Sequence, residues 1–180
     1  MFGLVLCLCS PSGSDKDEGA KSVEQLKIID NDITGWQIAK VSDTSVISDS
    51  FDVYTPAALY SKMDGPAGEY IDQGVVTAMF EHMTSPDGQN DLQLKVMDFG
   101  TPAKATAMFN DKKSREFNNA ILVAPYADTL VVARPLLAGL SVCAHYKKFY
   151  FEMDVSGFSD RTRELQTVDA VMDLFIRRIK

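Results

Sequence analysis

The feature that most constrains this fold is that its strand-like segments follow one another as hairpins. Segment 75–83 is followed by a Ser-Pro-Asp-Gly turn and then by the alternating run 92–96, and a turn of that composition joins antiparallel neighbours. Segment 149–155 alternates strictly, with its apolar side chains on one face. Helical segments stand between groups of strands, not after every strand. This order predicts a single α+β domain with a mainly antiparallel sheet.

About three to four helices are predicted to pack on this sheet. Thr-Pro pairs at 55–56 and 101–102 each place a capping residue before a proline, which is well tolerated as the first helical residue. A short helix is predicted over 67–73. In segment 165–179 apolar residues recur every three or four positions, so we expect an amphipathic C-terminal helix that covers one face of the sheet.

The chain changes character near its N-terminus. Residues 1–9 are mostly apolar, and the Ser/Gly/Asp-rich stretch that follows has little apolar surface to offset the entropy of ordering. We therefore interpret 1–9 as the remnant of a signal peptide, 10–32 as a polar flexible tether and 33–180 as the folded domain. The 180 residues contain no run of about 18 apolar residues that would span a membrane.

Two cysteines in the first segment are candidates for lipidation. In a bacterial lipoprotein an apolar segment leads to a cysteine that receives the lipid, and Cys9 or Cys7 would be that residue here. Leu precedes each cysteine where a small residue is expected, and no Lys or Arg precedes the short apolar run. The predicted location is the cell envelope, on the periplasmic or outer face of a membrane and held by lipid. The alternatives are an apolar N-terminus that packs on the domain and a cytoplasmic protein.

Charge and motif content exclude several classes of function. With 18 Lys and Arg against 25 Asp and Glu, the net charge is −7, which argues against a nucleic-acid partner. His82 and His145 have no acid or nucleophile at motif spacing, and no phosphate-binding or nucleophile-elbow motif occurs. We predict no catalytic residue, no metal and no cofactor. Cys143, in an apolar run, is interpreted as a small buried hydrophobe.

Candidate binding residues gather in and after segment 54–74. Asp64 with Gly65 breaks a helix, and Asp98 precedes a helix start, so both carboxylates are interpreted first as capping or turn residues. The aromatic side chains Tyr60 and Tyr70 could line an apolar groove, although their helical spacing also suits a core. Basic pairs such as 112–113 are interpreted as solvated.

Two segments resemble a known family. Leu59-Tyr60, Met63-Asp64-Gly65, Ala67, Tyr70 and Gly74 follow the order Leu-Tyr-x-x-Ile-Asn-Gly-x-Ala-x-x-Tyr-x-x-x-Gly, which marks the bacterial domain-of-unknown-function family 6599. Segment 96–109 is similar to that family's Met-Gly-Thr/Ser-Pro segment. Asp64 stands where Asn is usual, and Pro66 follows the glycine. The resemblance implies an exported or lipid-anchored envelope protein and supplies no activity, cofactor or catalytic residue.

These observations leave two functional hypotheses. The first is a non-enzymatic binding or accessory module of the envelope, which contacts a protein or a small ligand through segment 54–74 and meets the membrane only through a lipid anchor. The second is an enzyme of hydrolase type that uses carboxylates near segments 54–74 and 98–102, with Asp64 and Asp98 as its acid–base pair.

Overall fold

The computed structural model describes residues 21–43, 46–126 and 129–180. In chain order its strands are β1 (Gln37–Ile38), β2 (Lys40–Asp43), β3 (Val46–Asp49), β4 (Phe51–Tyr54), β5 (Thr77–Thr84), β6 (Asp91–Asp98), β7 (Ile121–Tyr126), β8 (Thr129–Leu136), β9 (Gly139–Tyr146) and β10 (Phe149–Ser156). Its helices are the 3-10 helix η1 (Val23–Leu26) and the α-helices α1 (Pro56–Met63), α2 (Ala67–Asp72), α3 (Pro102–Glu116) and α4 (Arg161–Ile179).

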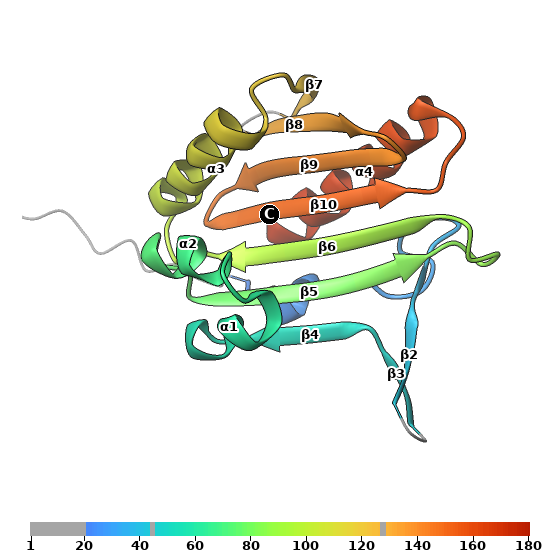
Figure 1. The fold of residues 1–180 in the computed structure, drawn as a ribbon, viewed down its shortest axis with the longest axis horizontal. Helices are drawn as coiled ribbons and strands as arrows, with labels where there is room; N and C mark the ends of the chain where they lie inside the picture. The colour runs from blue at the N-terminus through green and yellow to red at the C-terminus, as the bar shows by residue number, and fades with distance from the viewer. Residues whose placement is uncertain (1–20, 44–45, 127–128) are drawn as a thin grey trace, which may run out of the picture.

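The predicted α+β architecture is confirmed. Strands β1-β5-β6-β10-β9-β8-β7 pair in that order, β4 adds to β5, and every pairing is antiparallel. The predicted hairpin of β5 and β6 forms, and β6 pairs in turn with the distant strand β10 (Figure 1). Strands β2 and β3 form a separate two-stranded ribbon.

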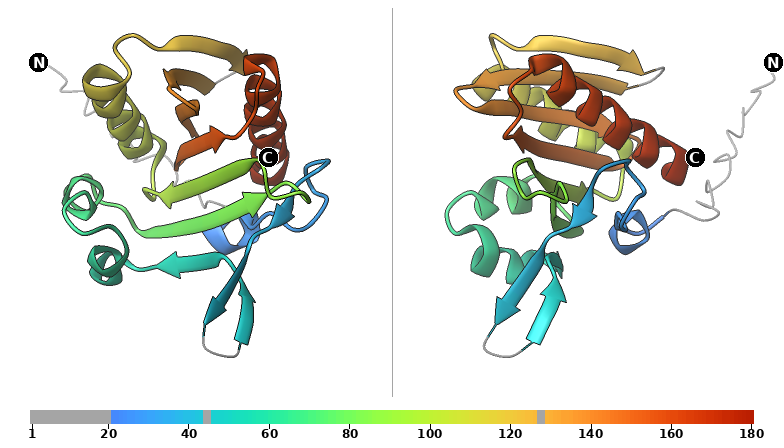
Figure 2. Two further views of the ribbon diagram at one scale, coloured as in Figure 1. Left: turned by 45° about the vertical axis from the view of Figure 1, so that its right-hand side comes forward. Right: turned by 90° about the vertical axis from the view of Figure 1, so that its right-hand side faces the viewer.

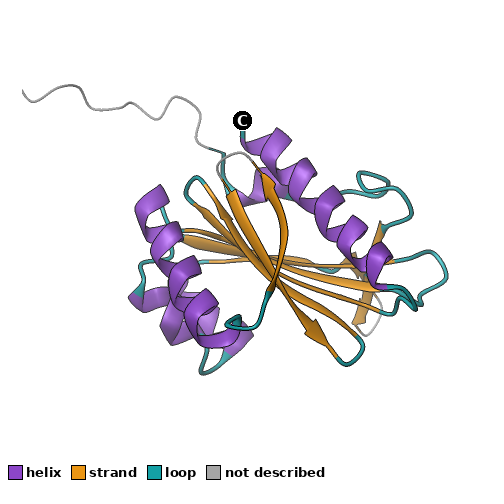
Figure 3. Cartoon of the chain, turned by 90° about the horizontal axis from the view of Figure 1, so that it is seen from above, coloured by secondary structure: helices purple, strands orange, loops and turns teal. Residues whose placement is uncertain are grey.

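Helices cover both faces of the sheet. Figure 3 shows α4 on one side of the strands and the other α-helices on the opposite side. The side of β10 that carries Phe149 and Phe151 belongs to the core under α4, and Tyr150 belongs to the core under α1–α3. The strict alternation of this strand therefore divides its side chains between two hydrophobic cores.

The helix starts follow from local capping. The Thr101 side chain accepts a hydrogen bond from the Lys104 N–H at 3.4 Å, ahead of Pro102, and the Asp160 carboxylate accepts from the Thr162 N–H at 2.8 Å. Both bonds satisfy N–H groups that the first helical turn leaves free. Helix α3 then continues to Glu116.

The N-terminal boundary of the domain lies earlier than residue 33. Val23, Leu26 and Ile28 are fully buried, and the Arg178 guanidinium of α4 donates to the Leu26 carbonyl at 3.0 Å and also binds Asp32. We call residues 21–36 the N-terminal segment; it lies beside α4 (Figure 2). The tether predicted for 10–32 is therefore wrong for the residues from 23 onward, because their apolar side chains complete the core.

Glu81 is buried beneath this N-terminal segment. Glu81 is 3% exposed. One of its carboxylate oxygens accepts a hydrogen bond from the Ile28 N–H at 3.1 Å, and the other has no hydrogen-bond partner among the described residues. Burial raises the pKa of the Glu81 carboxyl to about 7, although Lys27 and Arg178 act in the opposite direction. When the Glu81 carboxyl ionises, its buried charge opposes the packing of the N-terminal segment.

Candidate functional site

The face of the sheet under α1–α3 carries a largely buried carboxylate, that of Glu152 in β10. Its side chain is 17% exposed and accepts hydrogen bonds from the Tyr70 hydroxyl at 2.6 Å and the Tyr150 hydroxyl at 2.9 Å. Lys95, which stands opposite Glu152 in the β6–β10 pairing, donates to the second oxygen at 3.0 Å. Three donors from three elements thus hold one carboxylate in a fixed orientation.

A second lysine joins this carboxylate to the helices. The Lys112 side chain of α3 is only 8% exposed, and its ammonium lies 2.8 Å from Glu116, 3.0 Å from Glu69 and 3.9 Å from Glu152. It also lies 5.4 Å from the centre of the Tyr70 ring. Lys112 was expected to be solvated, and that prediction is wrong because three carboxylates surround its ammonium. We call Glu152, Tyr70, Tyr150, Lys95 and Lys112 the Glu152 cluster.

The electrostatics of the cluster keep its protonation states constant near neutral pH. Burial disfavours the charged form of Glu152, but Lys95, the Tyr70 hydroxyl and Lys112 outweigh it and lower the pKa of the carboxyl. Burial and the nearby Glu152 charge raise the pKa of both Tyr70 and Tyr150. The glutamate therefore stays ionised and the tyrosines stay protonated over the physiological range.

A cavity of about 590 Å³ opens beside this cluster. One wall comes from the helical segment 62–70 through Lys62, Met63, Pro66, Glu69 and Tyr70. The sheet supplies another wall through Phe80, Gln93, Lys95, Ser141, Glu152 and Asp154, and α3 supplies Lys112 and Glu116. The volume lies within the range of small-molecule sites, about 300–1,000 Å³.

The floor of the cavity is a polar row set by strand register. Gln93, Asp154 and Ser141 stand side by side on β6, β10 and β9. None of these three side chains is hydrogen-bonded or ion-paired to another residue within the described part of the chain. Unlike the Glu152 cluster, these groups keep their donors and acceptors available for a ligand.

The structure brings only one of the predicted binding residues into this cavity. Tyr70 lines it, whereas Tyr60 is 52% exposed and Asp64 and Gly65 lie in the exposed turn after α1. Asp98 is buried elsewhere: its carboxylate accepts the Gly100 N–H at 2.7 Å and pairs with an ammonium at 2.8 Å, that of Lys148. Asp98 thus fixes the turn before α3, as the capping interpretation expects.

Sequence reasoning missed Glu152, Lys95 and Lys112. The alternation in 149–155 indicated which side chains of that strand face the other core, and so contained a signal for Glu152. Lys95 and Glu152 are 57 residues apart in sequence. Their contact depends on the order of the strands in the sheet, which no local sequence pattern predicts. Cys143 is free and buried, as predicted, and burial raises the pKa of its thiol. Cys7 and Cys9 lie outside the described residues.

Within the part of the chain that the structure describes, no group of three or more His, Cys, Asp or Glu side chains is arranged to hold a metal ion. Among the helices of residues 21–43, 46–126 and 129–180, none has the length and apolarity needed to cross a membrane.

Comparison with known proteins shows a shared fold. No protein-family model matches the chain, and no curated protein matches it. Among solved structures, the chain is similar to the extracellular domain of PknH from Mycobacterium tuberculosis, with a TM-score of 0.53 and 12% sequence identity. The similarity covers 86% of this chain and 94% of that domain. At this identity the likeness concerns the fold.

Proposed function

We propose that this chain is a non-enzymatic binding domain of the bacterial cell envelope, and that a small polar ligand occupies the cavity beside the Glu152 cluster. The observation that carries the proposal is the contrast within that cavity. The Glu152 cluster is saturated by internal partners and forms a rigid wall, while Gln93, Asp154 and Ser141 on the floor are free. A preorganised wall beside free polar groups is the arrangement of a ligand site.

The protonation states of the cluster favour binding over catalysis. A general acid or base works best when its pKa lies near the operating pH, and the pKa values of Glu152, Tyr70 and Tyr150 move away from neutrality. The hydrolase alternative relied on Asp64 and Asp98. Asp64 is exposed in a turn and Asp98 is held by Lys148, and neither lines the cavity.

The chemistry of the ligand follows from the free groups on the floor. An amide, a carboxylate and a hydroxyl together offer both donors and acceptors, which suits a compact ligand with several hydroxyl or amide groups. Lys62 stands 5.4 Å from the centre of the Phe80 ring at one edge, and Asp52 pairs with its ammonium at 3.3 Å. We expect a neutral or zwitterionic molecule, because a strongly anionic one would meet Asp154 and Glu116.

The envelope location is supported by three observations of different kinds. The sequence places an apolar run and Cys9 or Cys7 before a polar stretch, the motif resemblance implies exported proteins, and a solved structure of similar fold is an extracellular domain. Labelled palmitate supplied to the native host tests the anchor. Incorporation that disappears in a Cys7→Ser, Cys9→Ser double variant supports it, and no incorporation into the native protein contradicts it.

Nuclear magnetic resonance tests binding and catalysis in one sample. Amide spectra of the labelled domain are recorded with mixtures of small sugars, amino acids and organic acids, which a cavity of this size can hold. We expect a sugar or amino acid to shift the amide signals of 62–70, 93–95 and 152–154. Ser141→Phe should remove the effect by filling the cavity, whereas Ser114→Phe on the exposed side of α3 should retain it. No shift with any compound contradicts the proposal, and new product signals support the hydrolase instead.

A further inference from the structure

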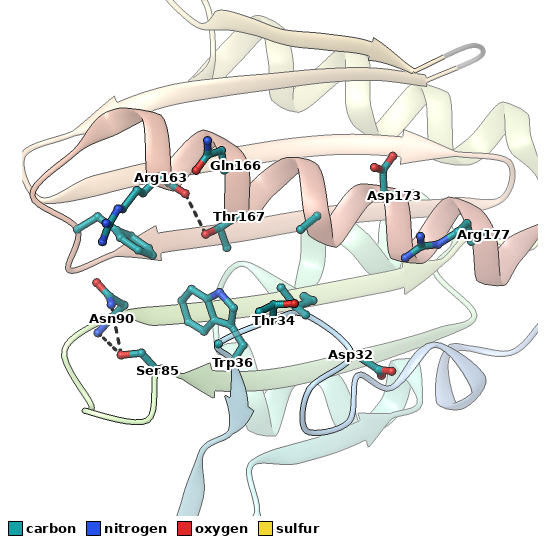
Figure 4. Close-up of a pocket in the computed structure, with 14 residues that line it drawn as sticks. Asp32, Thr34, Trp36, Ser85, Asn90, Arg163, Gln166, Thr167, Asp173 and Arg177 are labelled. Atoms are coloured by element: carbon teal, nitrogen blue, oxygen red, sulfur yellow. Dashed lines mark hydrogen bonds between the residues drawn. The ribbon is translucent and has the colours of Figure 1, made fainter.

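A second hollow lies on the opposite face of the sheet, between the N-terminal segment and α4. Its volume is about 540 Å³, and we call it the α4 groove. Figure 4 shows its two sides: α4 carries one row of side chains, and the loop that leads to Trp36 faces it. No residue of this groove belongs to the cavity beside Glu152, so the two hollows are separate.

The groove has an apolar middle. Trp36 and Phe158 form its floor, with ring centroids 6.1 Å apart, and Ala170 of α4 faces the same space. The indole N–H of Trp36 donates to no acceptor among the described residues. An aromatic floor with a free donor at its edge can hold an apolar side chain and bind one carbonyl beside it.

The charges of the groove are divided between its ends. Arg163 lies at one end with Asn90 and Gln166, whereas Asp173, Arg177 and Asp32 lie at the other (Figure 4). Neighbouring arginines are neutralised: Arg161 binds Glu164 and Arg178 binds Asp32.

Arg163 has no such partner. Its guanidinium forms no ion pair or hydrogen bond with another residue of the described chain. Arg177 likewise forms no ion pair within the described chain, but it follows Asp173 by one helical turn and shares its end of the groove with two carboxylates. The uncompensated positive charge of the groove is therefore at the Arg163 end.

We infer that the α4 groove binds a short extended peptide by its free C-terminal carboxylate. Arg163 receives the carboxylate, since a guanidinium presents paired donors that match its two oxygens. The last apolar side chain of the peptide lies on Trp36 and Phe158, and the preceding residues extend toward Asp173.

The dimensions of the groove agree with a peptide. Arg163 and Asp173 are ten residues apart on α4, about 15 Å along a helix that rises about 1.5 Å per residue. An extended chain covers that distance in four or five residues at about 3.3 Å each. Polar groups along this path, such as Thr34 and Gln166, can pair with peptide amides, whereas an aliphatic acid would leave them without a partner.

Trp36 provides a specific signal, because it is the only tryptophan of the chain. The probes are the tetrapeptide Ala-Ala-Ala-Leu with a free C-terminus, the same peptide amidated, and hexanoate. We expect the free-acid peptide to change the Trp36 emission saturably. It should bind at least about tenfold more tightly than the amidated peptide, because amidation removes one charge-assisted contact.

Variants assign this preference to Arg163. In the Arg163→Gln variant, the affinity for the free-acid peptide should fall about tenfold, to that for the amidated peptide. The affinity for the amidated peptide should be unchanged. Lys113→Gln, which removes an exposed cation from α3 on the other face, should leave both affinities unchanged. Ser141→Phe should also have no effect, so this result is independent of the proposed function of the cavity.

Four outcomes would overturn the inference. They are equal affinity for acid and amide, equal weakening of both by Arg163→Gln, hexanoate that binds as tightly as the peptide, and no change of emission at about 10 mM of any probe. Circular dichroism of each variant at the same pH shows whether α4 is intact.

Discussion

The buried carboxyl of Glu81 makes stability depend on pH in a direction opposite to that of most acidic groups. Its pKa is raised from 4.5 to about 7 by burial, so the folded state holds this proton more tightly than the unfolded state does. The stabilisation is complete below pH 4.5 and is lost as the pH rises through about 7.

The replacement Glu81→Gln removes this titration and keeps an oxygen that accepts the Ile28 N–H. At about 1.4 kcal/mol for each pKa unit, a rise from 4.5 to about 7 corresponds to about 3 kcal/mol. The stability of the variant relative to the native protein should therefore increase by about 3 kcal/mol between pH 4.5 and pH 8. The comparison across pH is not affected by any constant cost of the new amide.

Urea unfolding followed by Trp36 emission, at half-unit steps of pH, measures this difference. Glu69→Gln is the matched control, because Arg115 lowers the pKa of Glu69. Its effect on the free energy of unfolding should therefore be independent of pH above about 5.5. A difference for Glu81→Gln that is the same at pH 5 and pH 8 would refute the reasoning, because it would mean that Glu81 does not retain its proton in the folded state.

Three further predictions concern stability and reactivity. Glu152→Gln should destabilise the fold by about 3 kcal/mol in urea unfolding, because it leaves two buried or half-buried lysines without their central carboxylate. Gly139→Ala should lower the melting temperature, because its Cβ would lie 2.2 Å from the Val155 carbonyl oxygen; an unchanged melting curve contradicts this. Cys143 is fully buried and the pKa of its thiol is raised, so iodoacetamide at pH 8 should modify it only after unfolding, as mass spectrometry can show.

Local patterns predicted most of the helices and hairpins. The strand period of two is present in 149–155, and the Thr-Pro pairs mark the starts of α1 and α3 as predicted. The alternation in segment 35–41 predicts one continuous strand, but the chain forms β1 and β2 there, in different sheets. Strand β4 was not predicted, because its pattern is weak and its place depends on pairing with β5.

The candidate site was predicted less well for a physical reason. Tyr70 could be identified because it lies on a short helix whose limits are marked by local residues. The charged members of the cluster come from strands and helices far apart in sequence, and each charged residue alone is best read as solvent-exposed. Lys112 is the clearest case: only the fold shows that three carboxylates gather around its ammonium.

The contact of Arg178 with the N-terminal segment also bears on how the chain folds during synthesis. Arg178 and Leu26 are 152 residues apart, and ribosomes add about 5–20 residues per second. Synthesis of Arg178 thus follows that of the N-terminal segment by roughly 8 to 30 s. During that interval Val23, Leu26 and Ile28 lack the helix that covers them, so they are exposed to chaperones and to neighbouring chains. We expect this docking to be among the last steps of folding, because it needs the contacts with the greatest separation in sequence.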